Sequence, residues 1–394
     1  MGGHKEAMTK LDIFTWMAPA ALALAITAAS PARAADMPPS AQKLVQTLKL
    51  APDLVEGWEK EHVVPEAWIA EAKKVGELRI NGSWSHKDFR EISKPFLERY
   101  PFVEIKYARG STHVRARVPL IAFKEGRFVA DVITGIDSSL IQYRQADALT
   151  NMRDLPNLAN IPDGMGSATG NWVGFRMRFY GMSYNPKLVK KEDMPRRWED
   201  LITATHLHGG KIALWRGVTS WALPLWEVKG EAWMTDFIHK LFNTVKPQLR
   251  KEGARALVAL VGAGEFDAML PTAAYQVKLE ADKGAGVAFH ALDILPVTAS
   301  ALGVLKGTPG TGASKLFVNW LISKEGQLAQ FAADGNPPIH KELQARGFTA
   351  YPDEIRGKKI AFRDPELLGD DMKALYKILN PYLKGGTRSK KKKQ

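Results

Sequence analysis

Short apolar runs alternate with amphipathic stretches over the first part of the chain. The apolar runs are typical of strands, and residues 129–134, apolar on both faces, are typical of a central strand in a parallel sheet. Repeated strand–helix units of this size predict a parallel sheet covered by helices. The predicted strands are 78–80, 103–107 and 129–134, and the predicted helices are 87–100, 113–124 and 138–147.

A second alternating block follows residues 150–171, where prolines and glycines replace the apolar periodicity. Past Pro296 the pattern turns mostly helical, with amphipathic stretches at 313–323, 324–333 and 370–383. Two such blocks predict an α/β protein of two lobes. In the second block the predicted strands are 182–184, 211–214, 265–270 and 287–290, with helices from about 221 and at 273–283.

The first residues have the order of a secretory signal peptide. Lys5 and Lys10 precede the apolar run 17–30, and Ala32-Arg33-Ala34 places small residues where a signal peptidase cleaves. Fourteen residues rise only about 21 Å as a helix, too short for a hydrocarbon core of roughly 30 Å. We therefore expect cleavage after Ala34 and a periplasmic protein.

The composition excludes several kinds of site and disfavours a nucleic-acid partner. The chain has no cysteine, which excludes disulfides, thiolate metal ligands, a cysteine nucleophile and a lipid-bearing N-terminal cysteine. Six of the basic residues behind the net charge of +13 lie in the tail 384–394, without aromatic residues that could stack on bases. A solvated tail is favoured over a nucleic-acid or anionic-lipid patch, and no nucleic-acid partner is expected.

Catalytic and cofactor motifs are missing. The sequence has no G-x-S-x-G, and the glycine-rich stretch 307–315 lacks the G-K-[ST] ending of a phosphate loop. His206 and His208 have no neighbouring carboxylate or cysteine, so a surface loop is favoured over a metal site. The expectation is a protein without cofactor that is not an enzyme; an enzyme on the same fold is the less favoured alternative.

Several blocks match one known family in order and spacing. The most recognisable is FVNWLISKEGQ, within residues 315–340. Together the blocks resemble type II periplasmic binding proteins, specifically the ferric-binding branch of the family 1 extracellular solute-binding proteins. The other matching blocks are LRINGSWSHKDF (78–89), RGST (109–112), VADVITGIDSSL (129–140), WVGFRMRFYGMSYNPKLV (172–189), RRWEDLITATHLHGGKIAL (196–214), GEFDAML (264–270) and ADKGAGVAF (281–289).

The resemblance implies two lobes, each a mainly parallel sheet flanked by helices, joined by a two-strand hinge near residues 175–182 and 293–299. It also implies a monomer that captures a small solute between the lobes for the membrane permease of an ABC importer. The expected divisions are a signal peptide (1–34), an N-terminal helical extension (35–76), lobe 1 (77–174 plus 297–383), lobe 2 (175–296) and a basic tail (384–394).

Polar side chains follow the predicted strands, where ligands bind in open α/β sheets. Helix N-termini at these turns present free N–H groups that suit anions. For each serine or threonine, N-capping of the next helix is the plain alternative. The candidates are Ser83, Trp84 and His86 after the first strand, Ser111 and Thr112 after the second, Asp137, Ser138 and Ser139 after the third, and Arg216, Thr219 and Ser220 in lobe 2.

Two arginines lie on the predicted crossing strand, where family members often carry a ligand-facing arginine. Alternation places Arg176 and Arg178 on one face, with Met177 on the other. A guanidinium there would hold a carboxylate or phosphate bidentately. A hinge salt bridge is the alternative, and motif position favours Arg178 as the ligand contact.

The sequence departs from the family's iron-binding members at one position. Those members carry two adjacent tyrosines, whereas this chain has Ala274 followed by Tyr275. Loss of a phenolate removes a strong ligand for ferric iron. The expected ligand is therefore a small anionic organic solute or oxyanion, with no metal. The alternative is ferric iron with a synergistic anion, with Tyr275 and His86 as metal ligands.

Overall fold

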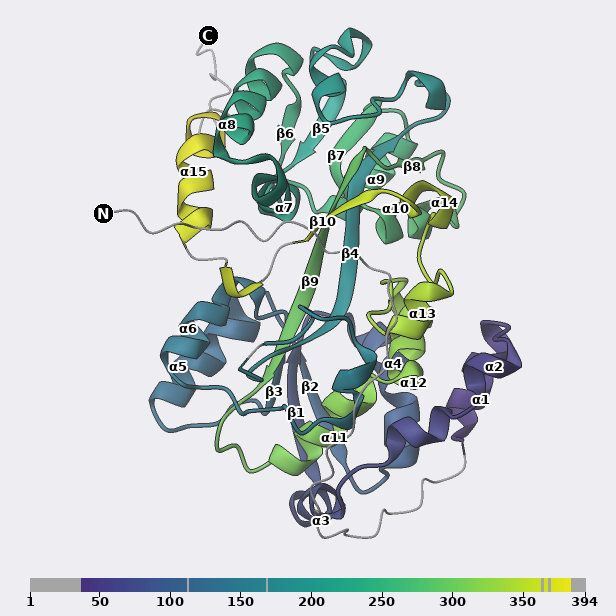
Figure 1. The fold of residues 1–394 in the computed structure, drawn as a ribbon, viewed down its shortest axis with the longest axis vertical. Coiled ribbons are helices and arrows are strands. Elements are labelled where there is room, and N and C mark those ends of the chain that lie inside the picture. The colour runs from purple at the N-terminus through teal and green to yellow at the C-terminus, as the bar shows by residue number, and fades with distance from the viewer. Residues whose placement is uncertain (1–36, 112, 168, 363–364, 368–369, 384–394) are drawn as a thin grey trace, which may run out of the picture. The chain divides into compact units, whose positions relative to one another are not determined.

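The computed structural model describes residues 37–111, 113–167, 169–362, 365–367 and 370–383. The expected signal peptide and basic tail lie outside these residues. Two sets of buried side chains form the cores of two lobes, and a path of strands in the order β2-β1-β3-β9-β4-β7-β5-β6 joins them (Figure 1).

Lobe 1 is built on three strands at one end of this path. β1 (Glu77–Gly82) pairs in parallel with β2 (Glu104–Arg109) and with β3 (Val132–Thr134), as the apolar runs predict. Helices cover the sheet, and the rings of Phe96, Phe317 and Trp320 pack together in the core. The covering helices are α4 (His86–Arg99), α5 (Val118–Lys124), α6 (Leu140–Gln145), α11 (Thr311–Leu321) and α12 (Lys324–Asp334).

Lobe 2 repeats this arrangement at the other end of the path. β5 (Ile212–Trp215) pairs in parallel with β6 (Gln248–Arg250) and with β7 (Ala268–Ala273). Trp198 and Trp221 stack at 5.2 Å within its core. The remaining elements are β8 (Ala288–His290), α7 (Thr219–Lys229), α8 (Glu231–Lys240), α9 (Ala254–Gly262) and α10 (Ala274–Ala281).

Two long antiparallel strands belong to both lobes. β4 (Val173–Tyr184) and β9 (Ile294–Val304) pair from Val173 opposite Leu302 to Phe179 opposite Val297, with a shift of register between Gly174 and Arg176. β9 also pairs with β3 of lobe 1, and β4 pairs with β7 of lobe 2. The two-strand hinge is thus confirmed. β9 continues through Pro296 to Val304, and the mostly helical part expected past Pro296 begins with α11.

The N-terminal extension is helical, as expected, and packs on lobe 1. It contains α1 (Pro39–Thr47), α2 (Pro52–Val55) and α3 (Glu66–Val75). Glu59 accepts from the Arg99 guanidinium at 2.7 and 2.8 Å, and the same guanidinium binds Glu325 on α12. This bridge joins the extension to two helices of lobe 1.

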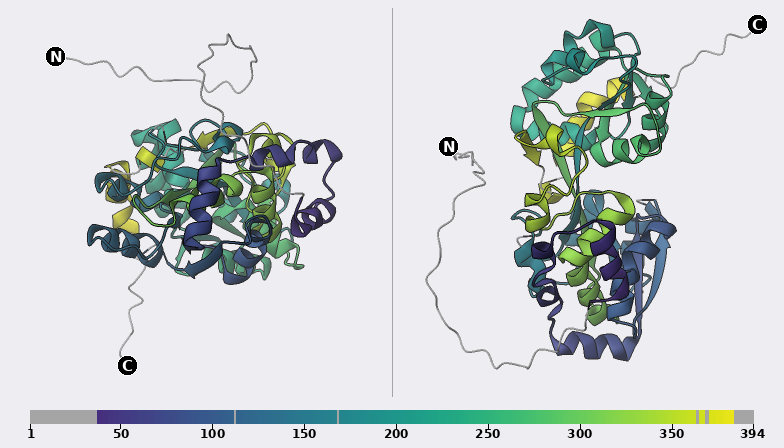
Figure 2. Two further views of the ribbon diagram at one scale, coloured as in Figure 1. Left: turned by 90° about the horizontal axis from the view of Figure 1, so that it is seen from below. Right: turned by 90° about the vertical axis from the view of Figure 1, so that its right-hand side faces the viewer.

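The C-terminal segment differs from its expected place in lobe 1. Leu375 and Leu379 on α15 (Asp370–Leu383) are fully buried in the core of lobe 2, and Figure 2 shows this yellow helix among the helices of that lobe. β10 (Lys359–Phe362) pairs in parallel with β9 at Ile294–Val297. The boundary 297–383 for lobe 1 therefore does not hold, because α15 belongs to lobe 2. An amphipathic pattern predicts a helix but does not say which core the helix covers. The linking segment contains α13 (Lys341–Ala345) and α14 (Pro352–Ile355).

Candidate functional site

A cavity of about 540 Å³ lies against β4, with residues of both lobes in its wall. We call it the interlobe cavity. Five arginines and three aspartates line it, an unusual density of charge for one cavity. The lining residues are Ser83, Trp84, Ser85, Asp88, Arg109, Arg115, Gly135, Asp137, Arg176, Arg178, Arg255, Tyr275, Gln276, Leu279, Ser300, Ala333, Asp334 and Asn336.

The turn after β1 forms one side of the cavity. Tyr107 packs so closely on this turn that a Cβ at Gly82 would lie 2.5 Å from its ring, and its hydroxyl donates to the Trp84 carbonyl at 2.8 Å. Ser85 caps α4 by accepting from the Asp88 N–H at 3.0 Å. Ser83 caps no helix, and it lines the cavity.

Arg176 is held by groups of lobe 1. Its Nη2 donates to Ser83 Oγ at 2.6 Å, and its Nη1 lies 3.5 Å from Asp334 Oδ2. The guanidinium also lies over the rings of Trp84 and Phe175, at 5.6 and 4.9 Å from their centroids. Burial, and then repulsion from Arg178, lower the pKa of Arg176 to about 10.

Arg178 has weaker protein partners. Its Nη1 donates to Ser300 Oγ at 3.3 Å, and the Tyr275 phenol lines the same cavity. Burial alone would lower its pKa, but Tyr275, Tyr180 and Asp137 together hold it above its ordinary value. Within the described residues Arg178 forms no ion pair, so its positive charge is left for another anion.

Two acidic groups are half-buried in the same cavity. Asp137 accepts from the Ala301 N–H through Oδ1, and Asp334 accepts from the Asn336 N–H at 2.9 Å. Burial raises the pKa of both carboxyls, and nearby arginines oppose the shift. These carboxylates offset part of the arginine charge without neutralising it.

The remaining arginines of the cavity wall differ in their hydrogen-bond partners. Arg115 donates to the carbonyls of Gly110 and Gly135 at 3.1 and 3.2 Å, which fixes the turns after β2 and β3. Arg255, from lobe 2, donates to Glu280 at 2.6 Å. Arg109 is exposed at the edge of the cavity.

The structure brings together only part of the predicted site. Of the sequence candidates, six line the cavity: Ser83, Trp84, Asp137, Arg176, Arg178 and Tyr275. Thr112 and the side chain of Ser138 lie outside the described residues. The others do not line this cavity: His86, Ser111, Ser139, Arg216, Thr219 and Ser220.

Several of these outlying candidates have plain structural roles. His86 is exposed and packs edge-on against Tyr107 at 5.5 Å, and Ser220 donates to the Gly217 carbonyl at 2.6 Å at the start of α7. Ser139 is buried, and Arg216 is exposed. These positions stay predictions as ligand contacts.

Sequence reasoning missed residues that reach the cavity from distant segments. Asp334 and Asn336 flank Gly335, whose positive φ ends α12, and Ser300 lies on β9 just past the expected hinge strand. The Asp-Gly-Asn turn was a usable signal, since such a turn aims polar groups at one point. Arg115 lay within a predicted helix and carried no signal.

Among the described residues no group of three or more histidines, aspartates or glutamates could hold a metal ion. No helix in the described part of the chain is long and apolar enough to cross a membrane.

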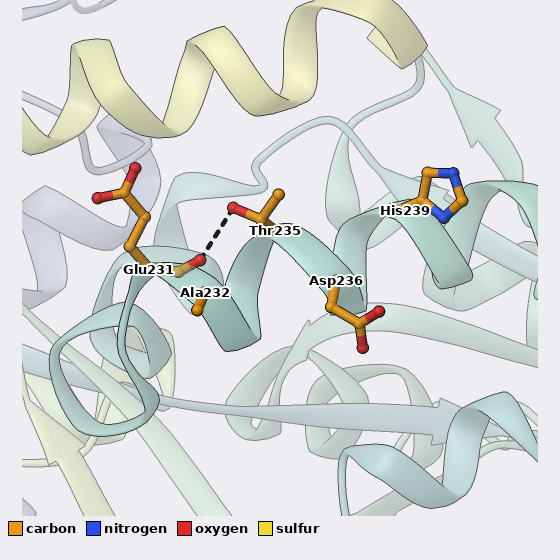
Figure 3. Close-up of a pocket in the computed structure, with 5 residues that line it drawn as sticks. All are labelled: Glu231, Ala232, Thr235, Asp236 and His239. Atoms are coloured by element: carbon orange, nitrogen blue, oxygen red, sulfur yellow. Dashed lines mark hydrogen bonds between the residues drawn. The ribbon is translucent and has the colours of Figure 1, made fainter.

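A larger hollow, of about 710 Å³, lies on one face of α8 (Figure 3). All five of its residues are exposed and come from one helix, and the Thr235 hydroxyl donates to the Glu231 carbonyl at 2.9 Å within that helix. No polar groups converge there from separate elements, so it is a surface groove. The hollow is lined by Glu231, Ala232, Thr235, Asp236 and His239.

Solved structures with this fold bind different solutes. Iron-bound HitA from Pseudomonas aeruginosa matches with a TM-score of 0.62 at 22% identity, over 77% of this chain and 98% of that one. AfuA from Actinobacillus pleuropneumoniae, with fructose-6-phosphate bound, matches with a TM-score of 0.62 at 21% identity, over 78% and 98%. The ferric binding protein from Campylobacter jejuni matches with a TM-score of 0.64 at 17% identity, over 77% and 98%. At these identities the likeness shows the two-lobed fold alone.

Sequence comparison establishes the family. No curated protein matches the chain. Residues 94–356 match the model of the bacterial extracellular solute-binding protein family, over most of both lobes. Members of this family are the solute-binding components of ABC importers. The chain therefore belongs to the bacterial extracellular solute-binding protein family.

Proposed function

We propose that this protein captures a small anionic organic solute or oxyanion in the interlobe cavity and delivers it to the membrane permease of an ABC importer. The mature protein would begin near Ala35 and act as a monomer in the periplasm. N-terminal sequencing of periplasmic extract and light scattering on the purified protein test these last two points.

The observation that carries the proposal is the position of Arg178. It lies on a strand shared by both lobes, lines the cavity and forms no ion pair within the described residues. A partly buried guanidinium without a counter-ion favours binding of a carboxylate or phosphate, which it can contact bidentately. Arg176 next to it adds to the positive potential.

The solved structures with this fold contain two classes of solute, an anion and a metal cation. Fructose-6-phosphate in AfuA is a phosphorylated, anionic sugar, and iron in HitA is a cation. Here, arginines outnumber aspartates in the cavity wall, and this arrangement repels Fe³⁺. Tyr275 lines the cavity, but His86, the other proposed iron ligand, is exposed and does not. The ferric alternative therefore has the weaker support.

A thermal-shift panel on unfolded, dialysed and refolded protein tests the proposal. A ligand at 100 times its Kd adds about 2.7 kcal/mol to the free energy of unfolding, which raises Tm by several degrees. The panel contains inorganic oxyanions, sugar phosphates, phosphonates, small carboxylates and ferric citrate. Arg178→Ala should lose the response to the best anion. A response to ferric iron alone would favour the alternative.

A further inference from the structure

One carboxylate in the interlobe cavity keeps a free oxygen in the middle of the arginines. Asp137 Oδ1 accepts from the Ala301 N–H, which fixes the side chain. For Oδ2 the described residues provide no hydrogen bond and no ion pair. The carboxylate nevertheless interacts electrostatically with Arg115, Arg176 and Arg178. An acceptor is therefore presented beside the group expected to bind the anion.

Two further carboxylates share this cavity. Asp334 uses Oδ1 for the Asn336 N–H, while its Oδ2 remains 3.5 Å from Arg176 Nη1. Asp88 lines the cavity, and within the described residues its carboxylate has no partner. A ligand that is only an acceptor, such as sulfate, would bring negative charge against these oxygens without offering them a proton. Like charges at such distances repel, and a buried acceptor without a donor is costly.

We propose that the solute carries a hydrogen-bond donor on or beside its anionic group, and that Asp137 selects it by accepting from that donor. The donor is a P–OH, a hydroxyl or an ammonium group, and each can lie close to the atoms that contact Arg178. This inference rests on the proposed anion site and adds the chemistry that site selects.

Matched pairs of small anions test the anion site and the selection by Asp137 separately. At about pH 8.5, where phosphate is mainly HPO₄²⁻, phosphate and sulfate have the same tetrahedral shape and charge and differ in one P–OH, and glycolate differs from acetate in one hydroxyl. Isothermal titration of each with the refolded protein gives the ratio of Kd within a pair. We expect phosphate and glycolate to bind at least 10-fold tighter than sulfate and acetate, because the charge-assisted hydrogen bond to Asp137 is lost with the latter.

Asp137→Asn is the sharpest variant. The amide oxygen still accepts from the Ala301 N–H, while an NH₂ replaces the free oxygen and turns an acceptor into a donor. The phosphate-to-sulfate preference should fall to within about threefold or reverse, since NH₂ favours a pure acceptor. Asp282→Asn, at an exposed position outside the cavity, is the matched control and should keep the wild-type ratio.

The possible outcomes distinguish a failure of the selection by Asp137 from a failure of the anion site. The ratios measured on the wild-type protein do not depend on whether a variant folds. Equal binding within both pairs by the wild-type protein would overturn the selection by Asp137 but keep the anion site. A preference that persists unchanged in a folded Asp137→Asn would assign the selection to another residue. Binding of none of the four anions, nor of the larger anions of the panel, would refute the anion site and this inference together.

Discussion

Arg176 on β4 donates a hydrogen bond to Ser83 Oγ at 2.6 Å, which ties the hinge strand to the turn after β1. Its other nitrogen lies 3.5 Å from Asp334. Arg178, two residues further on, has no carboxylate partner among the described residues. The two arginines on one face therefore differ in their contacts: Arg176 is bound to groups of lobe 1, whereas Arg178 has only a hydroxyl partner, which supports the proposed anion contact.

Arg178→Ala should weaken binding of the best anion by about 30-fold to several thousand-fold. Truncating one partner of a desolvated, hydrogen-bonded charge pair costs about 2–5 kcal/mol. The Tm of the ligand-free protein should change little, because Arg178 forms no ion pair within the described residues and its removal also removes a like charge next to Arg176. Isothermal titration and thermal melts measure the two effects. Arg197→Ala, which breaks an exposed pair with Asp200, is the control and should leave affinity unchanged.

Arg176→Ala should instead destabilise the ligand-free protein. Removing one partner of a buried pair leaves the other charge uncompensated, at about 3 kcal/mol. The Arg176 and Asp334 side chains are only 6% and 10% exposed, so solvent cannot replace the lost partner. Urea unfolding at pH 7 measures the loss, and Arg109→Ala, at an exposed position, should change it by less than about 0.5 kcal/mol.

The deficit of Arg176→Ala should shrink on acidification. Burial already raises the pKa of Asp334, and Arg176 opposes that shift, so its removal raises the pKa further. A carboxyl with a raised pKa in the folded state binds its proton more tightly folded than unfolded, so stability is regained as pH falls through the folded pKa. A deficit that is constant from pH 7 to pH 4.5 would contradict the role of Asp334.

The strand–helix order could be predicted because apolar periodicity is a local property. β1, α4, β2 and α12 lie within a few residues of their predicted bounds. The family resemblance placed a hinge strand near residues 293–299, but no local pattern predicted that β9 continues to Val304. The sequence also did not predict which lobe α15 packs on, because its apolar stripe would fit either core.

The candidate site was predicted where the strand pattern itself places residues. Alternation along β4 placed Arg176 and Arg178 on one face, and both line the cavity. Asp334 and Ser300 reach it because α12 and β9 pack against β4, a long-range arrangement that no local pattern encodes. Arg216 and Thr219 were expected from the rule for strand ends, but the wall from lobe 2 is formed by α9 and α10 instead.

His62 should make the protein sensitive to mild acid. It is buried between the N-terminal extension and lobe 1, and burial, with repulsion from Arg99, lowers its pKa well below its ordinary range. Glu325 lies 3.6 Å away, but its oxygens already accept from Arg99 and from Trp320 Nε1. The folded state therefore disfavours the proton that the unfolded chain takes up near pH 6.5.

Stability should fall as pH drops below 6.5, at up to about 1.4 kcal/mol per pH unit from this residue. Urea unfolding at pH 5.0 to 7.5 gives the slope. His62→Asn should flatten it, whatever its effect at pH 7. His239→Asn, on the exposed face of α8, should keep the wild-type slope. Parallel curves for wild type and His62→Asn would show that another group carries the pH dependence.

Tyr275 distinguishes an anion site from a ferric site. Its phenol lines the cavity together with Arg178 and accepts from Gln276 Nε2 at 3.3 Å, so it lies where it can donate to an anion or ligate a metal. As a neutral donor it contributes about 0.5–1.5 kcal/mol, and Tyr275→Phe should weaken anion binding only about 2- to 10-fold. As a phenolate ligand it would give a visible phenolate-to-iron absorption band in protein loaded with ferric iron. We expect no such band and a modest loss of anion affinity. A band that Tyr275→Phe abolishes and Arg178→Ala retains would establish iron as the solute, since only the metal depends on the phenolate oxygen.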